Sequence, residues 1–212
     1  LATPRIAWVA FALMLVGAVT NNVAVYQGGS SVMMTSYVPM MAAPSFYLGL
    51  ILFAVGALVA CFVFLGTLVV AKRDKTYQGS VPLVTGGGVT AWSVAVVTIA
   101  SGAIILVPTY LLSLGLIDSV DPLVYRTIWW AFGHSSQQIN VAAHISIWYA
   151  VAAIAFGATP MSERVSRGAF LLYILFLQLA SAHHLLSDPG MSTGWKVVND
   201  TTWEFTLKQG VK

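Results

Sequence analysis

The sequence predicts an all-α integral membrane protein, a single membrane domain over residues 1–212 with about five transmembrane helices. Hydrophobic residues make up 58% of the chain and charged residues only 8%, whereas an ordinary soluble domain is roughly 25% charged. The charges are also segregated, because Lys, Arg, Asp and Glu are absent from 6–71, 76–117, 127–162 and 168–187. A charge at the depth of the bilayer core is costly, so these stretches suit hydrocarbon and exclude a water-facing surface.

The spans follow from the length that a bilayer requires, about 20 apolar residues per helix. They are predicted at about 6–25, 46–70, 90–112, 123–157 and 168–186, with the start of a further helix at about 195–212. The fourth span is longer than a bilayer needs. Its first turn, near Trp129 and Trp130, is therefore expected at the membrane interface.

Turn-forming residues set the boundaries of the spans in order along the chain. The first span ends before GGSS at 28–31, and the second ends at the charged segment KRDKTYQGS at 72–80. Three glycines at 86–88 are interpreted as a turn before the third span. The fifth span ends at SDPG, residues 187–190.

The Lys and Arg residues of the connections predict the orientation, because cytoplasmic loops are enriched in them. Lys72, Arg73 and Lys75 lie between the second and third spans, and Arg164 and Arg167 lie between the fourth and fifth. The N-terminus is therefore expected inside. The net charge of +3 reflects these loops and gives no indication of a nucleic-acid partner.

The four histidines, His134, His144, His183 and His184, all lie in predicted spans, where ionisable side chains are rare and commonly functional. The fourth span enters from the outer side and the fifth ends there, so His134 and the adjacent pair are expected at one depth. Neutral imidazole is a favoured ligand of copper, zinc and iron, so these three predict a metal site. The alternative is that each hydrogen-bonds a neighbouring helix. His144 lies deeper on an offset face, which favours a structural or proton-handling role.

Two segments carry a resemblance to a known family. DPLVYRTIWWAFGHSSQQ at 121–138 and SERVSRGAFLLYILFLQLASAHHLLSDPGMSTGWK at 162–196 resemble subunit I of the haem–copper oxidase superfamily, most closely its B-type branch or a nitric oxide reductase relative. That family carries W-x-x-G-H-P-x-V-Y on its sixth helix and H-H-x-x-x-D-P-G at the end of its seventh. The resemblance covers nearly the whole chain and implies helices three to seven, with the start of eight, of a twelve-helix subunit.

The resemblance implies a metal-ligand set and a list of partners. His134, His183 and His184 match the family's copper ligands beside a high-spin haem, and non-haem iron is the alternative metal. The family's haem ligands lie on helices two and ten, so haem is expected to be held mainly by other polypeptide. The chain is then a split subunit or a fragment. Its expected partners are the rest of subunit I, an electron-accepting subunit, cytochrome c or quinol as donor, and the lipid of a prokaryotic cytoplasmic (inner) membrane.

The sequence departs from the family at the tyrosine that oxidases use to supply an electron and a proton to O2. Gln138 stands at that position, and Leu177 stands where the C-type branch places its tyrosine. Tyr173 is interpreted as lying on a poorly matching face and is not counted as a substitute. Two-electron reduction of two NO molecules does not need this tyrosine, so an NO reductase is favoured. Gln137 or Gln138 could then orient substrate, hydrogen-bond an intermediate or support a ligand histidine. The alternative is that both only satisfy neighbouring groups.

Deeper polar residues of the fourth span resemble a proton path in their placement. His144, Ser146 and Tyr149 are the candidates, and Tyr149 matches a polar position of the B-type path. Ile145 replaces the other matching tyrosine, so the path is interrupted unless His144 or Ser146 restores it.

Three functional hypotheses follow. The first is an NO reductase core, and the second is a terminal oxidase that reduces O2 to water with the same cofactors. The third is a non-catalytic structural membrane subunit. Retention of all three metal-ligand positions counts against the third hypothesis.

Overall fold

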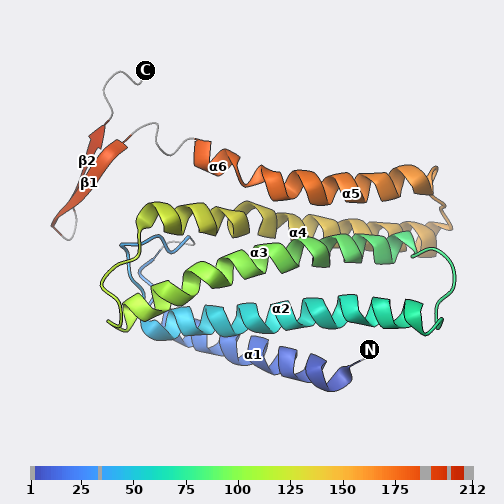
Figure 1. Ribbon diagram of the computed structural model, residues 1–212, viewed down its shortest axis with the longest axis horizontal. Helices are drawn as coiled ribbons and strands as arrows, with labels where there is room; N and C mark the ends of the chain where they lie inside the picture. The colour runs from blue at the N-terminus through green and yellow to red at the C-terminus, as the bar shows by residue number, and fades with distance from the viewer. Residues whose placement is uncertain (1–2, 33–34, 187–191, 200–201, 208–212) are drawn as a thin grey trace.

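The computed structural model describes residues 3–32, 35–186, 192–199 and 202–207. Five long helices lie side by side with alternating directions, and a short helix and a two-stranded hairpin follow (Figure 1). The elements are α1 Pro4–Tyr26, α2 Pro44–Arg73, α3 Leu83–Ser113, α4 Pro122–Phe156, α5 Glu163–Ala180, α6 His183–Leu186, β1 Ser192–Asn199 and β2 Thr202–Leu207.

The prediction of an all-α membrane bundle is confirmed. Helices α1 to α4 are each long and apolar enough to cross a membrane. The fifth long helix, α5, is also largely apolar, but Glu163, Arg164 and Arg167 occupy its first turns. The bundle is therefore built from apolar helices whose charges are confined to their ends.

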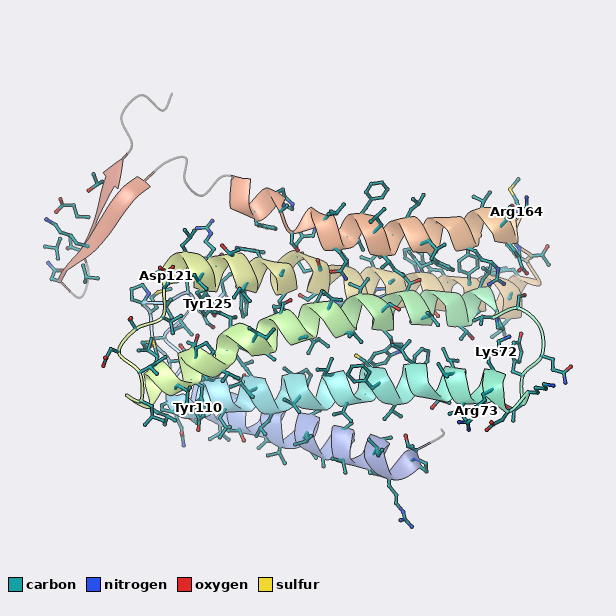
Figure 2. The ribbon with its side chains drawn as sticks, viewed as in Figure 1. Lys72, Arg73, Tyr110, Asp121, Tyr125 and Arg164 are labelled. Atoms are coloured by element: carbon teal, nitrogen blue, oxygen red, sulfur yellow. The ribbon has the colours of Figure 1, made fainter. Side chains whose placement is uncertain are left out.

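Basic residues gather at one end of the bundle, called the basic end below. Lys72 and Arg73 of α2 lie there together with Arg164 of α5 (Figure 2). Asp121, at the start of α4, lies at the opposite end. This distribution is the one that the Lys and Arg pattern of the connections predicts.

Helices α1 and α2 pack with their backbones in near contact. A Cβ atom added to Gly17 would lie 2.5 Å from the Phe53 backbone nitrogen, and one added to Gly49 would lie 2.6 Å from that of Asn21. A Cβ at Gly56 would similarly meet the Ala10 carbonyl oxygen at 2.7 Å. Small residues allow this close approach, which is a common basis of helix association in membranes.

Helix α3 is the most buried element, and it includes the three glycines that were predicted to form a turn. That prediction is wrong, because Gly86, Gly87 and Gly88 lie within the helix. A Cβ at Gly87 would lie 2.9 Å from Ser146 Cα on α4. At least one of the glycines is therefore explained by helix contact and not by a turn.

An aromatic cluster fills the bundle at the end opposite the basic residues. Tyr47 of α2 and Tyr125 of α4 are fully buried there, and Trp129 stacks on Tyr125 with ring centroids 5.9 Å apart. The Tyr125 hydroxyl donates to the Thr35 carbonyl at 2.9 Å. This hydrogen bond joins the connection between α1 and α2 to the start of α4.

The segment predicted as one helix over 168–186 differs at both ends. Helix α5 begins earlier, at Glu163, where the Ser162 hydroxyl accepts from the Val165 N–H. It ends at Ala180, and residues 181–182 form a tighter turn before α6. In that turn the His184 N–H donates to the Ser181 carbonyl at 3.2 Å, so the histidine pair sits on a separate short helix.

The prediction of a further helix beginning at 195–212 is wrong for the described residues of that range. They belong to β1 and β2, which pair antiparallel, with Lys196 opposite Glu204 and their side chains 2.9 Å apart. The segments STGWKVVN and TWEFTL are rich in β-branched and aromatic residues, which favour strands. The predicted SDPG turn at 187–190 lies outside the described residues.

Candidate metal centre

Three histidines from two helices converge at one point of the bundle. His134 lies on α4, and His183 and His184 begin α6. One ring nitrogen of each lies within 4.8 Å of the others. His134 Nδ1 and His184 Nε2 lie 3.0 Å apart. The structure therefore brings together the three side chains that the sequence singled out.

The donor set fits a transition metal. Two imidazole nitrogens that bind one metal at about 2.0–2.1 Å must lie between about 2.9 Å apart, for a right angle at the metal, and about 3.4 Å apart, for a tetrahedral angle. His134 and His184 meet this condition, and the ring centroid of His183 is 4.7 Å from that of His134. Imidazole suits copper, zinc and iron alike, so the three residues could hold copper or non-haem iron.

Neighbouring groups orient the imidazole rings. The Trp130 ring stacks on His184 with centroids 3.5 Å apart and planes at 4°, and its indole N–H donates to the Tyr37 hydroxyl. His183 Nδ1 bonds the Ala180 carbonyl, which can only accept a hydrogen bond. A hydrogen bond to this carbonyl needs the proton of His183 on Nδ1, and this tautomer leaves the lone pair of Nε2 for a metal.

Two serines join the helices that carry the histidines. The Ser135 hydroxyl lies 2.9 Å from that of Ser181 and donates to the Leu177 carbonyl at 2.8 Å. Both serines are buried. Ser135 follows His134 directly and Ser181 precedes His183 by two residues, so these bonds set the register of α4 against α5 at the site. Sequence reasoning missed this pair, although Ser135 replaces the proline of the family motif.

The two glutamines face different parts of the bundle. Gln137 is exposed and borders an apolar cavity of about 390 Å³ between α2, α3 and α4, together with Trp130 and Gly133. Gln138 is half-buried and points to α5, where the Tyr173 hydroxyl lies 3.0 Å from its Oε1 and 3.1 Å from its backbone oxygen.

The contact with Gln138 corrects the interpretation of Tyr173. Tyr173 was expected on a face that does not match the site, but Tyr173, Leu177 and Ser181 follow one another at intervals of four residues. Residues spaced in this way share one face of a helix. All three contact α4 through a hydroxyl or carbonyl group. The spacing was readable in the sequence and should have placed Tyr173 beside Gln138.

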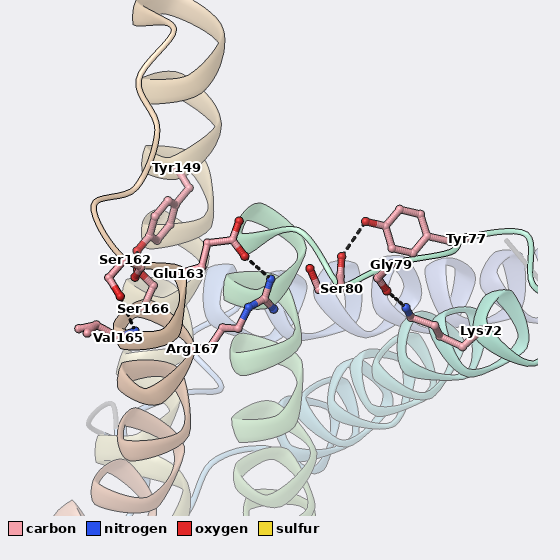
Figure 3. A network of polar contacts seen from close by, with 10 residues as sticks. All are labelled: Lys72, Tyr77, Gly79, Ser80, Tyr149, Ser162, Glu163, Val165, Ser166 and Arg167. Carbon is pink, nitrogen blue, oxygen red and sulfur yellow. Dashed lines mark hydrogen bonds and ion pairs between the residues drawn. The ribbon is translucent and has the colours of Figure 1, made fainter.

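The candidate proton-path residues do not form one chain. His144 is exposed, with Trp148 as a ring neighbour 6.4 Å away, and Ser146 donates to the Val84 carbonyl on α3. Tyr149 instead reaches α5, where its hydroxyl lies 2.7 Å from that of Ser166 (Figure 3). The structure thus separates the three residues that the sequence grouped.

A small cavity lies between α3, α4 and α5. It measures about 120 Å³, and hydroxyl-bearing residues from all three helices line it: Thr90, Tyr149, Ser166 and Tyr173. Space for water needs at least one probe-sized volume and two to four polar partners, which this cavity provides. Sequence reasoning missed Ser166 because it considered the polar residues of the fourth span alone.

Comparison with known proteins agrees with this geometry. Residues 1–202 match the family described as Cytochrome C and Quinol oxidase polypeptide I. The chain is 29% identical over 196 residues to Cytochrome c oxidase subunit 1 of Thermus thermophilus, covering 91% of this chain and 34% of that protein. A cryo-EM structure of a heme-copper terminal oxidase dimer is 28% identical, with a TM-score of 0.75, covering 88% of this chain and 32% of that one.

The chain therefore spans about a third of the length of the curated relative that it matches. The matched family is one of membrane oxidoreductases that bind haem and copper, and the cluster of three histidines is compatible with such a metal. From this match over nearly the whole chain, we conclude that the protein belongs to the Cytochrome C and Quinol oxidase polypeptide I family, the haem–copper oxidase subunit I family.

Proposed function

We propose that this chain forms part of the catalytic subunit of a respiratory reductase that converts nitric oxide to nitrous oxide. The observation that carries the proposal is Gln138, which stands where the family's oxidases have a redox-active tyrosine. An amide cannot be oxidised to a radical at an accessible potential. The reaction 2 NO + 2 H⁺ + 2 e⁻ → N2O + H2O does not call for that extra electron.

The three histidines would hold the metal of this site. His134, His183 and His184 offer three neutral nitrogen donors, and the convergence of their ring nitrogens supports ligation of copper, or of non-haem iron. A metal held there supplies Lewis acidity and one-electron redox chemistry beside the haem. The protein's own part is to fix the ring orientations, through Trp130 and the Ala180 carbonyl.

Gln137 and Gln138 are proposed to act on the substrate from different sides. Gln138 lies one helical turn from His134, so its amide can orient a bound diatomic molecule or hydrogen-bond an intermediate. Gln137 borders the apolar cavity, which suits an uncharged gas better than water. These roles are consistent with either NO or O2.

Protons are proposed to come from the basic end by way of Tyr149. Its hydroxyl bonds Ser166, whose own hydrogen is donated to the Ser162 carbonyl at 3.2 Å. Because a carbonyl only accepts, water near the charged pair of Glu163 and Arg167 would supply the proton (Figure 3). His144 is exposed and Ser146 bonds α3, so neither is proposed to continue this route.

The basic end is proposed to face the cytoplasm of a prokaryotic cell, with the N-terminus inside. The gathering of Lys72, Arg73 and Arg164 at that end supports this orientation. Haem would be held mainly by the remaining part of subunit I, and an electron-accepting subunit would receive electrons from cytochrome c or quinol. The largely exposed surface of α5 is consistent with further polypeptide or lipid around it.

Reduction of O2 to water is the second candidate function. Two observations favour it: the relatives named above are a cytochrome c oxidase subunit and a terminal oxidase, and Tyr173 lies against Gln138. Tyr173 is a redox-capable phenol near the position of the missing one. A non-catalytic subunit is the third candidate, and absence of copper and iron beside the haem would be its signature.

Paired gas electrodes decide between the first two candidates. The native complex is purified in detergent, supplied with one electron donor, and its consumption of NO and of O2 is measured with N2O analysis. Loss of NO with formation of N2O and little O2 uptake supports the NO reductase. Rapid O2 uptake with little NO turnover would replace it with the oxidase.

A further inference from the structure

The amide of Gln138 is held at one end by a residue of another helix. Tyr173 of α5 places its hydroxyl 3.0 Å from Gln138 Oε1 and 3.1 Å from the Gln138 backbone oxygen. Because the hydroxyl contacts both atoms, it fixes the side-chain amide relative to the α4 backbone. Both residues are half-buried, so water competes little for this contact.

Hydrogen-bond chemistry then determines which end of the amide remains available. A phenol hydroxyl donates one hydrogen bond, and an amide accepts through its oxygen and donates through its NH2 group. With Oε1 engaged by Tyr173, the NH2 group is the end left to bond elsewhere.

The helix geometry places Gln138 on the face of α4 that carries His134. Gln138 follows His134 by four residues, so both side chains lie on one face of α4. Side chains of an α-helix lean toward its N-terminus, and for Gln138 this is the direction of His134. Gln138 is thus one helical turn below His134 on the same face of α4, and its NH2 group is the end available to a ligand held by the histidines.

We propose that Tyr173 is a positioning residue for Gln138: it holds the amide so that the NH2 group donates to a diatomic ligand at the site of His134, His183 and His184. The inference rests on the proposed function, because it assigns Gln138 a direct contact with substrate. Two helices would then determine this hydrogen-bond donor, because α4 supplies the amide of Gln138 and α5 fixes the direction of the amide through Tyr173.

A double-mutant cycle tests the proposal in the complete complex. Tyr173→Phe removes one oxygen atom, and Gln138→Met replaces the amide by an apolar side chain of similar size. The two single variants and the double variant are compared with the native complex after copper and haem contents are shown to be equal. Tyr110→Phe on α3 is the control, because it removes a tyrosine hydroxyl at a position with no part in the proposed contact.

The first readout is the infrared C–O stretching band of carbon monoxide bound by the reduced complex, which responds to a nearby donor. Tyr173→Phe is expected to shift and broaden the band, and Tyr110→Phe to leave it unchanged. In the Gln138→Met background, Tyr173→Phe is expected to cause no further change. An unchanged band in the Tyr173→Phe variant would overturn the proposal.

The second readout is turnover of the gas that the native complex consumes. Loss of one directing hydrogen bond is expected to lower turnover about tenfold in the Tyr173→Phe variant. The same change should matter less than about twofold once Gln138 is Met, because the residue on which it acts is gone. Equal losses in both backgrounds would show that Tyr173 acts independently of Gln138 and would refute the positioning role.

Failure of the proposed function has a different signature. A native complex that consumes O2 and not NO would remove the NO reductase, while the shift of the band and the non-additive turnover would still establish the link between Tyr173 and Gln138. Conversely, a confirmed NO reductase with additive variants would keep the function and remove the positioning role.

Discussion

The α1–α2 interface and the α4–α5 interface hold helices together in opposite ways. At the first, backbones come into near contact through Gly17, Gly49 and Gly56, and the burial of Ala10 reflects close packing. At the second, none of the 18 described residues of α5 is buried. The helices are joined there by hydrogen bonds between side chains.

The α1–α2 interface therefore serves mainly the stability of the bundle, and the α4–α5 interface serves mainly the geometry of the site. Lipid is as apolar as a leucine side chain, so helices in a bilayer associate through close packing or through polar contacts. The α1–α2 interface depends mainly on packing, with one hydrogen bond from the Asn21 side chain to the Phe46 carbonyl at 3.2 Å, and none of the candidate site residues lies on these two helices. The α4–α5 interface aligns three polar contacts, Ser135 with Ser181, Gln138 with Tyr173 and Tyr149 with Ser166, with the histidine cluster above them.

The largest expected effect belongs to the histidine cluster and tests the functional side of the comparison. His184→Ala is expected to lower copper affinity by more than about a hundredfold, because loss of a ligand exceeds the cost of losing a supporting residue. Turnover should be lost with the metal. Metal analysis measures the first effect, and gas electrodes measure the second. A variant that retains its copper and its turnover would contradict the assignment of His184.

The next effect tests the packing side. Gly49→Leu is expected to lower the free energy of unfolding by about 3 kcal/mol, because the added side chain meets the α1 backbone and overpacking costs about 1–3 kcal/mol. Gly66→Leu is the matched control on the same helix, since nothing lies within 4 Å of a Cβ added there. Thermal denaturation in detergent compares them. Equal midpoints would mean that close backbone contact contributes little at this interface.

A smaller effect is expected from the serines that join α4 to α5. Ser135→Ala and Ser181→Ala should each lower copper affinity about tenfold, as loss of groups that orient metal ligands does, with a change in stability of about 1 kcal/mol. Ser101→Ala is the control, because the Ser101 hydroxyl bonds only its own helix, at the Val97 carbonyl. Competition with a copper chelator gives the affinities. Unaltered copper binding would mean that the serines join the two helices without orienting the metal ligands.

The smallest expected effect lies at the start of α4. The Asp121 carboxylate accepts from the N–H groups of Leu123 and Val124 at 2.8 and 2.9 Å, so Asp121→Ala should cost about 1 kcal/mol of stability. Copper binding should not change. Asp118→Ala removes an exposed carboxylate of the same connection as control. The two denaturation midpoints would coincide if the cap were unimportant.

Most of the fold could be predicted because the bilayer imposes simple rules on a sequence. Runs without charge predicted the spans. The basic residues at 72–75 and 164–167 were predicted to share one side of the membrane, and they gather at one end of the bundle. The glycines at 86–88 were wrongly interpreted as a turn because glycine is common both in turns and at close helix contacts. The role of Gly87 depends on the residue that faces it, Ser146, and that residue is distant in the sequence.

The candidate site also includes residues that the sequence predicted and contacts that sequence reasoning missed. His134, His183 and His184 could be found because histidines are few and their depths could be compared. The Tyr173 contact was missed although its spacing from Ser181 was available, because an isolated helix was compared with a family pattern instead of with its neighbour. The hairpin at β1 and β2 was missed because the expectation continued the series of membrane helices and did not weigh the strand-forming residues of that segment.

The glycine contacts between α1 and α2 have a consequence for biosynthesis. Two consecutive helices that pack backbone to backbone can associate as soon as both have entered the membrane. Helix α5 has no such surface, and its hydroxyl contacts need α4 to be already in place. We therefore expect assembly to proceed along the chain, with the first hairpin as a stable platform and the histidine cluster closing last.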